Sequence, residues 1–239
     1  MLVRVWLVIP CFNEALRLRP GKFKEFAAKY PNTYLCFVDD GSTDNTLALL
    51  QDLARNKDQL TVLHMPVNGG KGEAVRQGIL YGLLQKNFEV FGYWDADLAT
   101  PLSELENLCD TLASNENLKL VAGSRYLSSS NNIRRSTVRQ ALGKVFALLS
   151  RWYTGLPMRD SQCGAKLMQR EAAAIAFDRP FHSRWVFDVE VLLRLKRKFG
   201  RSAIGEVALH EWQERGGGSL SAKHYWKVPL ELLRLGLRR

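Results

Sequence analysis

The feature that most constrains the fold is a series of short apolar runs, each of which ends in polar residues. We expect buried strands at residues 3–9, 34–38 and 90–94. These runs lead into residues 10–14, Asp39-Asp40 and Asp95-Ala96-Asp97, and helical patterns separate them. Alternating strands and helices predict an α/β fold with a mostly parallel sheet. In such a sheet, ligand-binding groups collect outside the carboxyl ends of the strands.

The run at 90–94 ends in two carboxylates one residue apart, Asp95 and Asp97. Mg²⁺ and Mn²⁺ favour hard oxygen ligands and commonly keep positions for substrate phosphate oxygens. The pair therefore predicts a divalent-metal site in a nucleotide-dependent enzyme. A single pair of this kind is common and could simply open the next loop. The polar ends of the other runs favour the metal interpretation.

Two further strand ends carry residues suited to a ligand. Asp39, Asp40 and Gly41 precede a helix, and Thr43 or Asp44 as its N-cap would explain only part of this pattern. A strand at 60–65 leads into a glycine-rich loop at 66–72, and we expect a helix from about Glu73. Glycines allow close backbone approach, and a helix N-terminus attracts anions. A plain glycine-rich turn with a solvated lysine is the alternative.

Residues 8–14, 38–42 and 95–97 resemble the three N-terminal signatures of the GT-A glycosyltransferases of family 2. Within that family, the chain looks most like the dolichyl-phosphate glucosyltransferase and polyprenyl-phosphate mannosyltransferase branch, over nearly its whole length. The resemblance implies a Rossmann-like α/β fold, with a central, mostly parallel sheet flanked by helices. It also implies a single catalytic domain over residues 1–239, with a nucleotide-sugar and metal half at 1–124 and an acceptor half at 125–239.

The resemblance further implies a donor site, with Asp95 and Asp97 holding Mg²⁺ or Mn²⁺ and Asp39 and Asp40 on the base and ribose. The residues expected to bind the donor are Pro10, Asn13, Glu14, Asp39, Asp40, Asn68, Gly70, Lys71, Gly72, Asp95, Ala96, Arg215 and Ser219. The last two belong to a glycine-rich loop that would close over the diphosphate.

Later blocks supply the other implied residues. Residues 159–166 and 185–190 resemble two branch signatures, and the expected catalytic carboxylates are Asp97, Asp160, Asp188 and Glu190. Asp160 could equally be a turn residue, and Asp188 and Glu190 could simply favour the start of a helix through its dipole. The expected acceptor-phosphate residues are Arg125, Arg135, Arg139 and Lys166. Like charges at Arg135 and Arg139 could also be merely solvated.

Charge is divided unevenly along the chain. Residues 1–124 hold 12 Lys and Arg against 15 Asp and Glu, whereas residues 125–239 hold 22 against 9. A basic half suits a phosphorylated acceptor or an anionic membrane surface, although a solvated basic surface would look the same. Residues 224–239 resemble an interfacial helix around Trp226, with packing on the domain as the alternative. No recognised nucleic-acid module is present, so nucleic acid is not an expected partner.

Four scattered cysteines, without C-x-x-C spacing, predict free thiols and a reducing compartment. We see no signal peptide and no apolar run near the ~20 residues that cross a bilayer, unlike many relatives in the branch. The expected location is therefore cytoplasmic, or peripheral on the cytoplasmic membrane face.

Together with these features, the resemblance implies a metal-dependent transfer of sugar from a nucleotide sugar, of the UDP-glucose or GDP-mannose type, to a polyprenyl or dolichyl phosphate. The stereochemistry of the family implies inversion at the anomeric carbon. A family 2 enzyme with a soluble or saccharide hydroxyl acceptor is the first alternative, and it would need a general base. A nucleotidyltransferase would carry its glycine-rich signature directly after the first strand. A non-catalytic, basic membrane-binding protein would leave the acids at successive strand ends unexplained.

Overall fold

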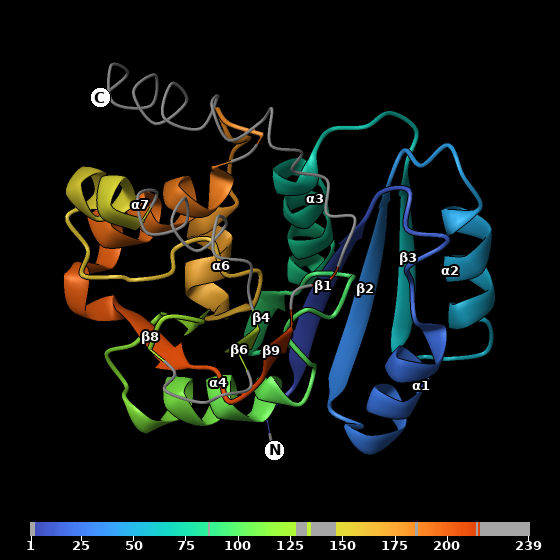
Figure 1. The fold of residues 1–239 in the computed structure, drawn as a ribbon, viewed down its shortest axis with the longest axis horizontal. Coiled ribbons are helices and arrows are strands. Elements are labelled where there is room, and N and C mark those ends of the chain that lie inside the picture. The colour runs from blue at the N-terminus through green and yellow to red at the C-terminus, as the bar shows by residue number, and fades with distance from the viewer. Residues whose placement is uncertain are drawn as a thin grey trace.

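The computed structural model describes residues 3–85, 87–127, 133–134, 147–184, 186–213 and 215. In this part of the chain, seven strands form one sheet in the order β3-β2-β1-β4-β7-β5-β8 (Figure 1). The strands are β1 (Val5–Cys11), β2 (Thr33–Asp40), β3 (Leu60–Met65), β4 (Val90–Tyr93), β5 (Leu120–Ser124), β7 (Lys166–Gln169) and β8 (Ile204–Ala208). β7 runs antiparallel to both of its neighbours, and the other pairs are parallel. A short parallel pair joins β6 (Ile133–Arg134) to β9 (Trp212–Gln213).

Helices cover both faces of the sheet. The helices are α1 (Pro20–Lys29), α2 (Thr46–Ala54), α3 (Lys71–Leu84), α4 (Glu104–Ser114), a helix at 147–154, α6 (Arg170–Ala176), α7 (Phe187–Phe199) and the 3-10 turn η1 (Arg201–Ala203). One core cluster contains buried residues of α1, α2 and α4, and the other contains buried residues of α3, α6 and α7. Figure 1 shows α2 and α3 on opposite sides of β1–β3.

The first strand shows why these runs are apolar at nearly every position. Side chains of a strand point alternately to its two faces. Leu7 and Ile9 of β1 pack in the cluster with α1 and α2, whereas Trp6 and Val8 pack in the cluster with α3. Because both faces are covered, neither set of positions tolerates polar side chains, and the strand reads as a continuous apolar run.

Several expected boundaries were wrong by a few residues. Asp39 and Asp40 are the last residues of β2 rather than the loop after it, and α3 begins at Lys71 rather than near Glu73. β5 continues to Ser124 because its pairing with β8 reaches that residue. α4 begins at Glu104, after a turn in which Glu104 N–H donates to Pro101 O.

The expectation of free cysteines agrees with the structure. All four cysteines are buried free thiols. Leu105, Leu108 and Leu112 of α4 pack in the core. Among the described residues, we find no helix with the length and apolar character needed to span a bilayer.

Parallel pairing places the carboxyl ends of β1, β2, β3 and β4 at one edge of the sheet. Ile9 pairs with Phe37, and Asp40 pairs with Met65, so the segments that follow these strands start side by side. This edge is where the polar strand ends predicted from the sequence come together.

Candidate functional site

The two carboxylates after β4 are held by a tight turn. Trp94 N–H donates to Val8 O, which extends β4 beside β1, and Leu98 then adopts a left-handed φ of 54°. Ala99 N–H donates to Asp97 Oδ1 at 2.9 Å. Burial raises the pKa of Asp97, and the neighbouring Asp95 charge raises it further. Two like charges on one short turn make the site receptive to a cation.

Lys71, the first residue of α3, meets the first of these carboxylates. Its Nζ donates to Asp95 Oδ1 at 2.5 Å. Burial acts to raise the pKa of Asp95, but the charge and hydrogen bond of Lys71, with the charges of Lys166 and Arg125, together outweigh burial, so the pKa lies below its usual value. Gly70 precedes the helix with φ of 89°, which brings Lys71 to this position. The predicted donor residue Lys71 and the predicted metal ligand Asp95 therefore contact each other.

Glu14 adds a third carboxyl group to this region. Its Oε1 pairs with Arg17, whereas its buried Oε2 has no hydrogen-bond partner in the described structure. Burial raises the pKa of Glu14 to about 7, with Asp97 and Asp95 contributing and Arg17 opposing. The backbone N–H of Glu14 donates to Thr46 Oγ1 at 2.8 Å, which ties the segment after β1 to α2.

Asp40 holds the glycine-rich loop. Its Oδ1 accepts from Gly69 N–H at 2.7 Å and its Oδ2 from Gly70 N–H at 2.9 Å. Asn68 Nδ2 donates to Asp40 O at 3.1 Å. On the other side of the loop, Arg184 donates to both the side-chain and the backbone oxygen of Asn68. The loop that starts α3 is thus fixed from two directions.

Asn13 and Asp39 shape the remaining strand ends. Asn13 has a left-handed φ of 52°, and its Oδ1 accepts from Thr43 N–H at 2.9 Å. Asp39 is fully buried, and its Oδ2 lies 2.8 Å from His64 Nδ1. Asp39 Oδ1 is buried without a partner in the described structure. A buried carboxylate oxygen without a partner is costly, which marks Asp39 as a candidate for a ligand contact.

Lys166 and Asp188 form a buried ion pair. Lys166 has 0% exposure, and its Nζ donates to Asp188 Oδ1 at 2.6 Å and to Cys163 O at 2.6 Å. Tyr93 Oη donates to the same Asp188 oxygen at 2.6 Å. Lys166 was expected to face an acceptor phosphate, but its side chain has no exposed surface with which to do so.

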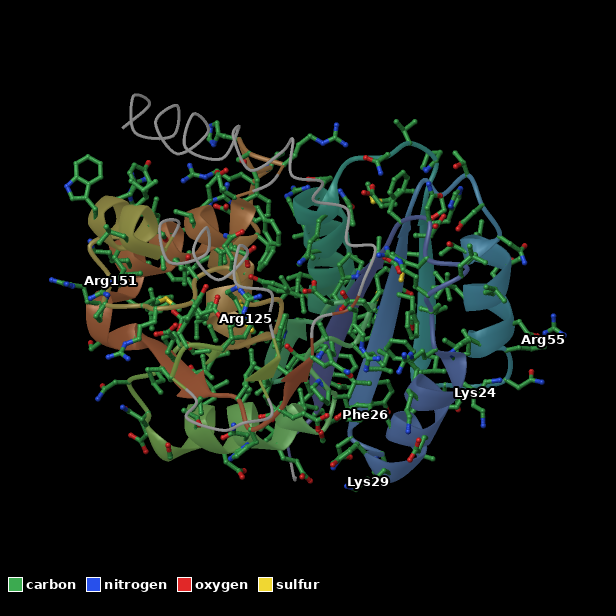
Figure 2. The ribbon with its side chains drawn as sticks, viewed as in Figure 1. Lys24, Phe26, Lys29, Arg55, Arg125 and Arg151 are labelled. Atoms are coloured by element: carbon green, nitrogen blue, oxygen red, sulfur yellow. The ribbon has the colours of Figure 1, made fainter. Side chains whose placement is uncertain are left out.

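The other two expected catalytic acids also have structural partners. Asp160 accepts two bonds from the guanidinium of Arg125, at 2.6 and 2.7 Å, and a third from Arg125 N–H. Glu190 accepts from Ser183 N–H at 2.8 Å, from His182 N–H at 3.2 Å and lies 3.7 Å from Arg194. Arg125 is mostly buried within the molecule, unlike Arg55 or Arg151, which project from it (Figure 2).

The remaining predicted residues are distributed as follows. Pro10 lies in β1, Ala96 is buried, and Gly72 packs in the first turn of α3 so closely that a Cβ would lie 2.9 Å from Phe187. Arg215 is half-buried. Arg135, Arg139 and Ser219 lie outside the described residues, as do residues 224–239.

Sequence reasoning missed three residues that shape the site. Arg184 contacts Asn68 across 116 residues of sequence, and no local pattern signals such a contact. Tyr93 was read only as part of a strand. Gly164 sits against Asp95, where a Cβ would lie 1.9 Å from Oδ2. Its place in the block at 159–166 was the one available signal.

The described residues contain no cluster of three or more His, Cys, Asp or Glu arranged around a metal position. Asp95 and Asp97 nevertheless offer hard oxygen donors to a cation, and a lysine ammonium already contacts one of them. Such a donor set fits Mg²⁺ or Mn²⁺, which commonly take their other ligands from substrate phosphates and water.

Comparisons with known proteins agree with this geometry. Residues 6–177 match the family model for glycosyl transferase family 2. The chain is 31% identical to a dolichyl-phosphate beta-glucosyltransferase of Trichomonas vaginalis, over 96% of this chain and 70% of that protein. It is 33% identical to the dolichyl-phosphate beta-glucosyltransferase of Mus musculus, over 97% of this chain and 74% of that protein.

A solved structure shares the fold. The glucosyl-3-phosphoglycerate synthase of Mycobacterium tuberculosis, in complex with Mn²⁺ and UDP-glucose, matches with a TM-score of 0.70 and 18% identity. The match covers 99% of this chain and 78% of that one, and it supports the predicted GT-A fold. The chain therefore belongs to glycosyltransferase family 2 and is an enzyme of that family.

Proposed function

We propose that this enzyme transfers a hexose from a nucleotide sugar, of the UDP-glucose or GDP-mannose type, to a polyprenyl or dolichyl phosphate with inversion at the anomeric carbon. The observation that carries the proposal is the Asp95-Ala96-Asp97 turn, placed with Lys71 at the shared edge of the parallel strands. The names of the relatives support the choice of acceptor. We also propose one catalytic domain over 1–239, because β7 and β8 join the sheet that begins the chain.

In this proposal, Asp95 and Asp97 would hold Mg²⁺ or Mn²⁺ at the donor site. The metal would supply charge neutralisation to the leaving diphosphate. Asp39 offers its unpartnered Oδ1 to the donor base, and Glu14 offers its Oε2 to the same donor. Asp40 takes a supporting role, because both of its oxygens already hold the backbone of the glycine-rich loop. Gly70 and Gly72 let that loop approach the diphosphate.

The remaining candidate catalytic acids are buried and hydrogen-bonded within the protein, which favours an anionic acceptor. Asp160, Asp188 and Glu190 are each at most 5% exposed, and each has the hydrogen-bonded partners described above. A hydroxyl acceptor would need one of them to accept a proton, whereas a lipid phosphate is already an anion at neutral pH. We therefore assign these three carboxylates to positioning the site.

Basic residues of the second half are the proposed acceptor-binding groups. Arg135 and Arg139 keep the role expected from the sequence, and Arg215 keeps its expected place over the diphosphate. Arg125 and Lys166 would act through the carboxylates that they hold, Asp160 and Asp188. A lipid acceptor would bring the basic half to an anionic membrane surface on the cytoplasmic side.

The experiment is an assay of nucleoside diphosphate release with a panel of UDP- and GDP-sugars and Mn²⁺. Each donor is tested with a short-chain polyprenyl phosphate in anionic vesicles and with soluble hydroxyl acceptors. We expect release with the lipid phosphate to require metal. Asp97→Asn should lower it by about two orders of magnitude or more, because a ligand of the cation is lost.

One control variant and two possible outcomes make the result interpretable. Asp52→Asn changes an exposed acid of α2 whose only described ion pair is a long contact to Arg55, and it should keep wild-type turnover. Wild-type activity in strong chelator would contradict the metal assignment. Transfer to a soluble hydroxyl acceptor, with every lipid phosphate ignored, would contradict the acceptor assignment.

A further inference from the structure

The Lys71–Asp95 contact lies where the proposed metal must bind. Lys71 Nζ is 2.5 Å from Asp95 Oδ1, and the two side chains are 39% and 37% exposed. The pair is therefore partly exposed to solvent, whereas the pair of Lys166 and Asp188 lies inside the protein. A cation that coordinates this Asp95 oxygen would be repelled by the ammonium group, so its binding favours the departure of that group.

The surroundings show why a lysine occupies this place. Burial acts to lower the pKa of Lys71, but the negative charges of Asp95, Asp188 and Asp97 raise this pKa above its ordinary value. Asp188 is already neutralised by its own bond to Lys166. The charge left over on Asp95 and Asp97 has to be balanced by Lys71 until a metal arrives.

The two lysines also differ in how firmly they are held. Lys166 Nζ has two hydrogen-bond acceptors and is packed against Tyr93 at 5.3 Å from the ring centroid. The hydrogen bond described for Lys71 Nζ is the one to Asp95, and the Phe187 ring lies 6.0 Å away. The flexible four-carbon stem of a lysine allows its ammonium to move several ångströms without any change of backbone. Lys71 can therefore leave Asp95 while α3 stays in place.

We propose that Lys71 is a resident counter-ion of the metal site, one that competes with the metal for Asp95 and is released to the donor diphosphate. This inference rests on the proposed metal and donor site. Metal alone would have to displace the lysine without giving it a new partner. Metal that arrives with a nucleoside diphosphate gives the lysine phosphate oxygens in exchange.

The consequence is cooperative binding of metal and nucleotide. By thermodynamic linkage, the nucleotide must increase metal affinity by the same factor as the metal increases nucleotide affinity. Lys71 would make that factor large by weakening the binding of metal alone. A lysine that only bound phosphate would not affect the affinity for metal alone.

The test is a titration of Mn²⁺, followed by the electron paramagnetic resonance signal of free Mn²⁺, with and without UDP or GDP. Lys71→Met should bind Mn²⁺ alone at least about tenfold more tightly than wild type, because an adjacent opposite charge commonly shifts a carboxylate equilibrium by one to three powers of ten. The gain in Mn²⁺ affinity on adding nucleotide should shrink. Lys71→Arg keeps the charge and should stay within about threefold of wild type for Mn²⁺ alone.

Lys119→Met is the matched control. Lys119 precedes β5 and bonds Gln169, so its loss removes one positive charge away from the metal carboxylates. It should leave both affinities unchanged. Circular dichroism verifies that the variants fold, and Lys71→Gln replaces Lys71→Met if the latter does not.

The outcomes separate the two proposals. If wild type binds Mn²⁺ with nucleotide but removal of the Lys71 charge leaves Mn²⁺-only binding unchanged or weaker, the counter-ion inference is wrong. Equal tightening by Lys71→Arg and Lys71→Met would also overturn it, because charge would not be the cause. If wild type binds no Mn²⁺ even with nucleotide, the proposed metal site fails instead.

Discussion

At the scale of single residues, Gly164 shows how closely the site is packed. A Cβ at this position would lie 1.9 Å from Asp95 Oδ2, so Gly164→Ala must displace the Asp95 carboxylate. A shift of about 1 Å at a reacting group can lower a rate by about a hundredfold, so we expect a loss of that order in sugar transfer. Steady-state assays with saturating Mn²⁺ check this.

The control for that substitution is Gly21→Ala in α1, where no heavy atom lies within 4 Å of the added Cβ. This substitution should leave sugar transfer unchanged. It should raise the unfolding free energy by up to about 1 kcal/mol, because alanine reduces the conformational entropy of the unfolded chain. Wild-type transfer by Gly164→Ala would show that the packing against Asp95 is not needed.

Glu14 predicts a pH dependence of stability in the metal-free protein. Burial raises its pKa from 4.5 to about 7. Between these values the folded protein holds a proton that the unfolded chain has released, so the unfolding free energy should fall as pH rises from about 4.5 to 7. A shift of this size corresponds to about 3 kcal/mol.

Glu14→Gln removes this titration. Urea unfolding in chelator at pH 5 and pH 7.5 should show the variant gaining up to about 3 kcal/mol relative to wild type at the higher pH. A difference in unfolding free energy between wild type and Glu14→Gln that does not change with pH would contradict the prediction.

At the scale of elements, the start of α3 depends on Asp40 of β2. Asp40→Ala leaves the Gly69 and Gly70 N–H groups without their acceptors. An unsatisfied buried donor costs about 1–3 kcal/mol, and because these two amides are only partly buried we expect the lower part of the summed range, a loss of about 2–4 kcal/mol in unfolding free energy. Faster hydrogen exchange at the Gly69 and Gly70 amides should accompany it.

Asp52→Ala in α2 is the comparison, since its ion pair with Arg55 is exposed and 3.7 Å long. Exposed pairs of this kind contribute at most about 1 kcal/mol. Unchanged exchange at Gly69 and Gly70 in Asp40→Ala would show that the loop is held by Arg184 instead.

At the scale of the whole molecule, the Lys166–Asp188 pair joins the middle of the sheet to a covering helix. Lys166 comes from β7, Asp188 from α7, and Tyr93 of β4 bonds the same oxygen. Lys166→Met leaves Asp188 buried without its counter-charge and should cost about 3–5 kcal/mol of unfolding free energy.

Replacing both partners, in Lys166→Met/Asp188→Leu, should recover much of that loss, because no buried charge remains. Chemical unfolding of wild type, both single variants and the double variant gives the coupling free energy between Lys166 and Asp188. Additive losses in the double variant would show that the pair does not act as a unit.

How far the fold could be predicted differs along the chain. The first four strands of the sheet, α2, α3 and the free cysteines were predicted from the sequence, with boundaries within a few residues. α1, α6 and β7 were not. β7 is only four residues long and is fixed by antiparallel pairing to β4 and β5, which are distant in sequence. Such pairing leaves no local periodicity to detect.

The candidate site divides in the same way. The sequence placed Asp39, Asp95 and Asp97 at strand ends, and the structure puts them there. The sequence could not distinguish carboxylates that are exposed from those that are already hydrogen-bonded to other groups of the protein. Asp160 is hydrogen-bonded to Arg125, which is 35 residues away in sequence. Asp188 is hydrogen-bonded to Lys166, which is 22 residues away.

The sequence by itself determined the α/β class, the edge of the sheet that carries polar groups and the position of the two acids that follow β4. These follow from local rules, since strand burial and strand ends leave a pattern within a few residues. Only the tertiary structure decided that Lys71 lies on Asp95, that Gly164 packs beneath it and that Lys166 is buried. Contacts of this kind depend on how distant segments pack, and burial then determines whether a charged group faces a ligand or its own counter-charge.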